Sequence, residues 1–460
     1  MKKTTITWYQ SVLAAVALGG VTLPAVTTGA VKPPQAPEAA LQIRTQLDRP
    51  VLLQQGDRHR VVVEIEIEGI DAPARERPPL NIAVVMDRSG SMSGQKLEQA
   101  RQAASLLVSQ LSPNDRVSLI TYDSEIEVLV PSTRMKKKAR AITRQISAIV
   151  PGGSTALYAG VEAGAEQVAE FYDEASLNRV ILLSDGLANV GPKSNREIVS
   201  LGQRFADQGI SVTTIGLGFD YNEILMTSLA EASDANFYHV ADVETLPEVF
   251  ERELGELQSV VARKIVVEVT CPSGVKPLRF LGRPETLDAQ VETVELATVA
   301  GKQSRRLFLE CEVSPEAEVS EQEIAQVVAR FIDARDQEQA EVVAAPVAVK
   351  FSKEIAEVEA SVNQAVAADA AVWTNATVVE EALALADEGA IVASREMLAA
   401  QETVLQEALD AAPPAQRAEL EAEIGLNRVA QAELDSGAGG VSSESRKQLR
   451  AGAFSKRNAR

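Results

Sequence analysis

The stretch from residue 81 to residue 100, "NIAVVMDRSGSMSGQKLEQA", contains the transition that decides the fold of this chain. Its first part, "NIAVVM", is a short continuous apolar run, which is typical of a strand buried on both faces. From Leu97 onward the apolar residues recur at intervals of three and four, which is typical of a helix. Between the two, Asp87, Ser89 and Ser91 alternate with other residues in a glycine-containing turn. The stretch therefore predicts a strand, a polar loop and a helix in succession.

The same alternation continues along the chain and predicts a doubly wound, Rossmann-like α/β domain over residues 80–257. The runs "RVSLITY", "RVILLS" and "SVTTIGLG" are short and apolar, as buried parallel strands are. Further helical patterns separate these runs, and they begin near Lys137, Ala156, Asn195, Tyr221 and Thr245. Strands alternating with helices over this length favour a mainly parallel sheet covered on both faces.

Two more loops of this domain carry side-chain oxygens. "PGGSTALYAG" places Thr155 after a glycine pair and before a helix, and "VILLSDGLANVG" places Asp185 directly after a strand. In doubly wound sheets, ligands bind outside the carboxyl ends of the strands, where these loops would meet. Ser154 is the alternative hydroxyl in the first loop, but the spacing to the following helix favours Thr155. The candidate site therefore consists of Asp87, Ser89, Ser91, Thr155 and Asp185.

The chemistry of this set points to a hard cation. It combines two carboxylates with three hydroxyls and includes neither histidine nor cysteine. Oxygen-only ligand sets suit Mg²⁺, which prefers six ligands and often takes one from water or a partner. We expect Mg²⁺ at this site, and Mn²⁺ or Ca²⁺ is also compatible with it.

In this order and spacing, D-x-S-x-S at residues 87–91 followed by Thr155 and Asp185 resembles the metal-ion-dependent adhesion site of von Willebrand factor type A (VWA) domains. The resemblance extends over about 80–257 and includes "TIGLGFDYNEILMTSLAEAS", which is similar to a stretch of bacterial members. The domain series is also similar to exported bacterial VWA proteins and to the VWA region of inter-alpha-trypsin inhibitor heavy chains.

The resemblance implies a role for each residue of the site. Ser89 and Ser91 would bind the metal directly, and Thr155 would bind it directly or through water. Asp87 and Asp185 would act directly, or through water and hydrogen bonds to the hydroxyls. Family members leave one coordination position for a carboxylate of a partner protein. An acidic residue of a protein ligand is therefore the expected partner.

Three functions compete at this point. We expect cation-dependent protein binding or adhesion by a protein that is not an enzyme. One alternative is a structural envelope scaffold whose metal only stabilises the fold. A metal-dependent hydrolase is the other, but "GSMSG" is not G-x-S-x-G, His59 and His239 are the only histidines, and no P-loop is present.

The regions around the α/β domain differ from it in pattern. Strand-like stretches occupy 41–79 and 258–351, and the earlier ones are too few to form a stable sheet alone. We therefore expect both to build one β-sandwich, with the α/β domain inserted between them. The Ala-, Glu- and Leu-rich stretch 352–436 predicts about three antiparallel helices, and 437–460 reads as a flexible basic tail.

The N-terminus has the pattern of a secretory signal peptide over residues 1–30, followed by a Pro-rich linker at 31–40. We therefore expect an extracytoplasmic protein, periplasmic or secreted, with no transmembrane segment in the mature chain. The net charge of -20, from 65 acidic and 45 basic residues, argues against a nucleic-acid partner.

The chain has only two cysteines, and both lie in the second strand-rich region. Given export, a disulfide between Cys271 and Cys311 is the favoured expectation, with two buried free thiols as the alternative.

Overall fold

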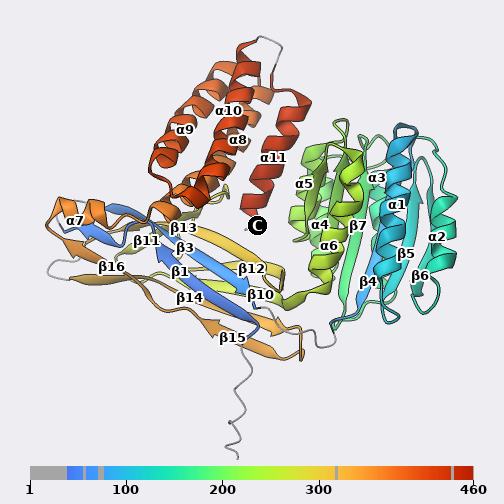
Figure 1. Ribbon diagram of the computed structural model, residues 1–460, viewed down its shortest axis with the longest axis horizontal. Helices are drawn as coiled ribbons and strands as arrows, with labels where there is room; N and C mark the ends of the chain where they lie inside the picture. The colour runs from blue at the N-terminus through green and yellow to red at the C-terminus, as the bar shows by residue number, and fades with distance from the viewer. Residues whose placement is uncertain (1–38, 55–57, 71–76, 316–319, 437–439, 459–460) are drawn as a thin grey trace, which may run out of the picture. The chain divides into compact units, whose positions relative to one another are not determined.

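The computed structural model describes residues 39–54, 58–70, 77–315, 320–436 and 440–458, in which an α/β domain, two further sheets and a group of helices are present (Figure 1). The predicted signal peptide and nearly all of the predicted linker lie outside these residues. Within the described ranges, no helix combines the length and the apolarity needed to cross a membrane.

The α/β domain contains a six-stranded sheet in the order β6-β5-β4-β7-β8-β9. All neighbouring strands run parallel except β6, which pairs antiparallel with β5. The strands are β4 (Leu80–Asp87), β5 (Arg116–Tyr122), β6 (Ile126–Arg134), β7 (Leu177–Ser184), β8 (Ser211–Leu217) and β9 (Phe237–Val240). The helices are α1 (Gln95–Gln110), α2 (Ala139–Ser147), α3 (Leu157–Ala169), α4 (Asn195–Asp207), α5 (Glu223–Ala232) and α6 (Leu246–Gln258), with 3-10 turns η1 (Gly90–Met92) and η2 (Val243–Thr245).

Helices cover both faces of this sheet, and β4 shows how. Ile82 and Val84 belong to a core shared with α1, α2 and α6, whereas Ala83 and Val85 pack with α3, α4 and α5. Every residue of β4 is therefore buried, which explains its continuous apolar run. The predicted doubly wound α/β fold is confirmed, and the loop after β4 lies at the carboxyl edge of the sheet.

The two remaining sheets form the β-sandwich. One has the order β1-β3-β13-β11 and the other β12-β10-β14-β16-β2, with β15 paired to β14. The strands are β1 (Leu41–Leu47), β2 (Val51–Leu53), β3 (His59–Gly69), β10 (Val260–Thr270), β11 (Val275–Phe280), β12 (Val291–Ala300), β13 (Ser304–Val313), β14 (Glu321–Asp333), β15 (Gln339–Val343) and β16 (Val347–Ser352). Alternate residues of β3, such as Val63 and Ile65, are fully buried in the shared core.

The α/β domain interrupts this sandwich between β3 and β10, as predicted. Strand β3 pairs with β13 from His59 to Glu68, so the N-terminal strands belong to the same sheet as the later strand β13. The chain leaves and re-enters the sandwich at one place, the turn between β12 and β13. There the amide of Lys302 donates to the carbonyl of Gly69 (2.8 Å), and that of Gly301 donates to the carbonyl of Ser259 (2.8 Å).

Three long helices follow the sandwich: α8 (Gln364–Asp387), α9 (Ile391–Ala411) and α10 (Pro414–Asp435), after the short α7 (Ile355–Ala360). Their core includes Phe308 of β13, whose ring lies 4.7 Å from that of Trp373 in α8. The helices therefore pack on the face of the β1-β3-β13-β11 sheet that the sandwich core leaves free.

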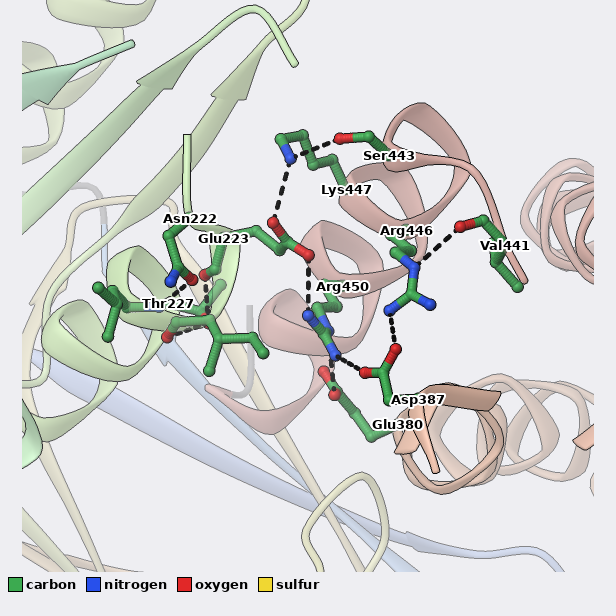
Figure 2. Close-up of polar contacts among 12 residues, drawn as sticks. Asn222, Glu223, Thr227, Glu380, Asp387, Val441, Ser443, Arg446, Lys447 and Arg450 are labelled. Atoms are coloured by element: carbon green, nitrogen blue, oxygen red, sulfur yellow. Dashed lines mark hydrogen bonds and ion pairs between the residues drawn. The ribbon is translucent and has the colours of Figure 1, made fainter. Parts of the chain in front are cut away.

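The expectation of a flexible basic tail at 437–460 was wrong, because residues Ser443–Arg457 form a packed helix, α11. The helix begins after Ser442, whose side chain accepts a hydrogen bond from the amide of Ser445 (3.2 Å). Figure 2 shows Glu223 of α5 between Lys447 and Arg450 of α11, at 3.1 and 2.9 Å. The sequence pattern suggested a solvent-exposed tail because the acidic partners of these basic residues are distant in sequence.

The cysteines also differ from expectation. Cys271 and Cys311 are both free and buried, and both belong to the sandwich core. The neighbouring Cys271 thiol, and then burial, raise the pKa of the Cys311 thiol. The sequence placed the two residues in the same region correctly, but the oxidation of adjacent thiols depends on the redox potential around them and not on position alone.

Candidate metal centre

Three loops meet at the carboxyl edge of the parallel sheet. The loops after β4 and β7 are neighbours because these strands pair directly. Backbone hydrogen bonds tie the loop before α3 to both of them. The amide of Gly90 donates to the carbonyl of Gly153 (3.0 Å), that of Gly152 to the carbonyl of Arg88 (2.6 Å), and that of Asn189 to the carbonyl of Thr155 (3.2 Å). The local geometry is therefore fixed by main-chain contacts.

The glycine pair in the loop before α3 is required by close approach. A Cβ atom on Gly152 would lie 1.7 Å from Oδ2 of Asp123, which is a steric clash. Arg88 lies on the same side and pairs with Asp123 (3.2 Å) and with Glu127 (3.0 Å). Two carboxylates from the β5–β6 hairpin therefore compensate its charge.

Asp87 ends β4 and is fully buried. Its Oδ1 accepts a hydrogen bond from the amide of Ser89 (2.8 Å), and its Oδ2 accepts one from Oγ of Ser184 (2.8 Å). Burial raises the pKa of Asp87, and the hydrogen bonds from Ser89 and Ser184 offset part of that effect. Both carboxylate oxygens are thus held in place before any ligand binds.

The hydroxyls continue from this carboxylate to the second one. Oγ of Ser89 and Oγ of Ser91 lie 3.1 Å apart, and Ser91 donates to Oδ1 of Asp185 at 2.7 Å. A Cβ atom on Gly186 would lie 3.2 Å from Oγ1 of Thr155 and 3.6 Å from Oγ of Ser91. The absence of a side chain at Gly186 thus leaves space beside these two hydroxyls. All five predicted residues are brought together, and Thr155 is buried whereas Ser154 is exposed.

Two further residues of this centre were missed by the sequence analysis. Ser184 orients Asp87, and its signal was a polar residue at the end of an apolar strand. Lys96, the second residue of α1, places Nζ 2.5 Å from Oδ2 of Asp185. Its signal was a cation in the first turn of a helix, a position that favours acidic residues.

The residues present fit a hard divalent cation. Among the described residues, no group of three or more His, Cys, Asp or Glu side chains is arranged to hold a metal. The donors here are instead hydroxyls supported by two buried carboxylates, with the space at Gly186 beside them. Ser89, Ser91 and Thr155 would hold the ion, and Asp87 and Asp185 would orient the hydroxyls.

Comparison with known proteins defines the class of this domain. Residues 81–252 match the family model of the von Willebrand factor type A domain. This part of the chain is therefore a VWA domain, a class that generally mediates protein–protein interaction or adhesion. A solved structure described as von Willebrand factor type A from Catenulispora acidiphila superposes with a TM-score of 0.68 and 15% identity. That match covers 91% of this chain and 98% of the other, so it shows the shared fold.

Two relatives illustrate the similarity in sequence. The chain is 27% identical to Uncharacterized protein YfbK of Escherichia coli (strain K12), over 49% of this chain and 40% of that protein. It is 33% identical to inter-alpha-trypsin inhibitor heavy chain H4 of Homo sapiens, over 33% of this chain and 17% of that protein. The chain therefore spans less than half the length of either relative.

Proposed function

We propose that this protein captures a partner protein by presenting a divalent cation, Mg²⁺ in the first instance, to an acidic side chain of that partner. The convergence of the Ser89, Ser91 and Thr155 hydroxyls between two buried carboxylates carries this proposal. The class of the domain supports it, because VWA domains generally mediate protein–protein interaction. Binding outside the cytoplasm is part of the proposal and rests on the signal-peptide pattern of residues 1–30.

The ligand set explains why the ion would seek a carboxylate from outside. Both oxygens of Asp87 already accept hydrogen bonds from the protein, and Asp185 accepts from Ser91 and Lys96. Neutral hydroxyls then provide most direct ligands, which leaves the charge of the cation poorly neutralised. An acidic side chain of a partner would complete its coordination and supply the missing negative charge.

The first experiment measures metal binding and partner binding together on the full chain. We expect Mg²⁺ to raise the melting temperature of the wild type, since an ion that binds only the folded state stabilises it. Ser91→Ala removes a hydroxyl ligand and should abolish most of that shift. Ser93→Ala is the matched control, because Ser93 is exposed and donates instead to the carbonyl of Gly90 (2.7 Å).

The second arm offers immobilised protein to envelope and secreted extract in Mg²⁺ or in EDTA. We expect wild type and Ser93→Ala to capture a partner protein in Mg²⁺ and not in EDTA. Ser91→Ala should capture none in either condition. A metal-dependent melting temperature together with capture that is the same in all lanes would favour the scaffold alternative.

A further inference from the structure

We infer that Lys96 is a tethered cation of the metal centre, which competes with the divalent ion for Asp185 and turns the loaded centre into a site for anions. The inference rests on the proposed function. In this account Lys96 lowers the affinity of the centre for the metal and raises the affinity of the metal-loaded centre for the partner's carboxylate.

The geometry places the ammonium group inside the centre. Nζ of Lys96 lies 2.5 Å from Oδ2 of Asp185, whose Oδ1 accepts from Ser91. The Asp185 side chain is fully buried, and that of Lys96 is 26% exposed. A buried carboxylate requires compensation of its charge, and among the described residues Lys96 provides it for Asp185 through an ion pair.

The position of Lys96 in its helix supports a role beyond helix formation. The N-cap of α1 is Gly94, so Lys96 occupies the second helical position. A cation in the first turn of a helix opposes the helix dipole and is unfavourable there. The loop after β8 packs alongside, since a Cβ atom on Gly218 would lie 3.8 Å from both Cε and Nζ of Lys96. A residue that is unfavourable locally is thus held at the site by its tertiary contacts.

Charge balance gives the consequence for ligands. Counted as two carboxylates and one ammonium group, the side chains of Asp87, Asp185 and Lys96 together carry one net negative charge in the absence of a metal. A divalent cation reverses this to one net positive charge. The ammonium therefore repels the metal, and it adds to the attraction for the partner's acid once the metal is bound. Arg88 cannot play this part because Asp123 and Glu127 already compensate it.

The test uses the full chain and the variant Lys96→Gln, which removes the charge and keeps an N–H donor for Asp185. Lys96→Arg keeps the charge. Lys193→Gln removes one positive charge from an exposed position in the loop that follows Asp185. Mg²⁺ affinity is measured by calorimetry, and acetate binding to the Mn²⁺-loaded protein by paramagnetic relaxation of the acetate methyl protons.

We expect Lys96→Gln to bind Mg²⁺ at least about tenfold more tightly than wild type, and to bind acetate several-fold more weakly when loaded. Lys96→Arg and Lys193→Gln should stay within about twofold of wild type in both measurements. In EDTA, Lys96→Gln should melt several degrees below wild type, and Mg²⁺ should close this gap.

The outcomes separate this inference from the proposed function. Equal Mg²⁺ affinity in wild type and Lys96→Gln overturns the inference and leaves the proposed function standing. Mg²⁺ binding by Lys96→Gln alone supports the inference and overturns the proposed function of the native chain. Absence of binding in every variant overturns both.

Discussion

At the residue scale, buried charges in this protein depend on partners from distant segments. Glu64 of β3 is an example, because it shares the guanidinium of Arg306 with Asp369 of α8. Nη1 of Arg306 lies 3.7 Å from Oε1 of Glu64 and 2.6 Å from Oδ2 of Asp369. Two acids therefore share one base where α8 packs on the sandwich. Burial is the main cause that raises the pKa of Glu64 to about 7. The charge of Arg306 opposes this shift, and the charge of Asp369 adds to it.

This shift predicts a pH dependence of stability. The folded state holds the proton of Glu64 more tightly than the unfolded state, whose pKa is near the ordinary value of 4.5. The stabilisation is therefore complete below pH 4.5 and is lost as the pH rises through about 7. Glu64→Gln should remove this loss and raise the free energy of unfolding at pH 8 by about 1–2 kcal/mol, a value reduced for partial exposure.

Urea denaturation at pH 5 and pH 8 measures the effect of Glu64→Gln. The control is Glu341→Gln, which removes an exposed ion pair with Arg330. It should change the free energy of unfolding by no more than about 0.5 kcal/mol at either pH. The same pH slope in wild type and Glu64→Gln would show that Glu64 is not the titrating group.

At the scale of an element, α11 links the VWA domain to the helices. Lys447 and Arg450 have side chains only 2% and 6% exposed, and both pair with Glu223 at the start of α5. Arg450 also approaches Glu380 of α8 (3.5 Å), as Figure 2 shows. Burial, the largest single influence, would by itself raise the pKa of Glu223. The backbone hydrogen bond to its carboxylate and the charges of Lys447 and Arg450 together outweigh burial, so the pKa of Glu223 is lowered. Ion pairs between elements thus hold this helix in place.

Glu223→Gln should therefore destabilise the protein by about 3 kcal/mol, because it leaves a buried ammonium without its counter-charge. The free energy of unfolding from urea denaturation measures this. Glu162→Gln breaks an exposed pair with Arg204 in the same domain and should cost less than about 1 kcal/mol.

The double variant Glu223→Gln with Lys447→Met distinguishes a charge effect from a packing effect. Removing both charges should cost less than the sum of the two single changes, since neither charge is then left unpaired. Additive costs would contradict this account of α11.

At the scale of the whole molecule, the VWA domain is an insertion with a complete sheet of its own. Within the part of the chain that the structure describes, all six strands of this sheet lie between Leu80 and Val240. Arg77 at the start of the domain pairs with Asp115 at 2.6 Å. The sandwich, in contrast, needs segments from both sides of the insertion, because β3 pairs with β13. The two units therefore differ in their dependence on the full chain.

A chain of residues 77–258 should consequently fold alone and keep the Mg²⁺-dependent rise in melting temperature. A chain of residues 39–258 would contain β1 to β3 but not β10 to β16, with which they form the sandwich. Limited proteolysis should therefore remove β1 to β3 first. An unfolded 77–258 chain would show that α11 or the sandwich is required for the domain to fold.

The candidate site was largely predictable because its information is local. Asp87, Ser89 and Ser91 lie within five residues. Thr155 lies between a glycine pair and a helical pattern, and Asp185 directly follows an apolar strand and precedes a glycine. Ser184 and Lys96 were missed because each is defined by the atom that it contacts. Spacing along the chain does not report such contacts.

The sequence by itself determined the alternation of strands and helices, the strands on either side of the insertion, and the oxygen-rich loop after β4. These features depend on periodicity and on turn residues, which act over a few positions. Only the tertiary structure decided that the basic C-terminus is the packed helix α11, that Lys96 reaches Asp185, and that Cys271 and Cys311 are adjacent free thiols. The physical reason is that charge pairing and side-chain contact depend on distance in space, and the partners here lie from 40 to over 200 residues apart.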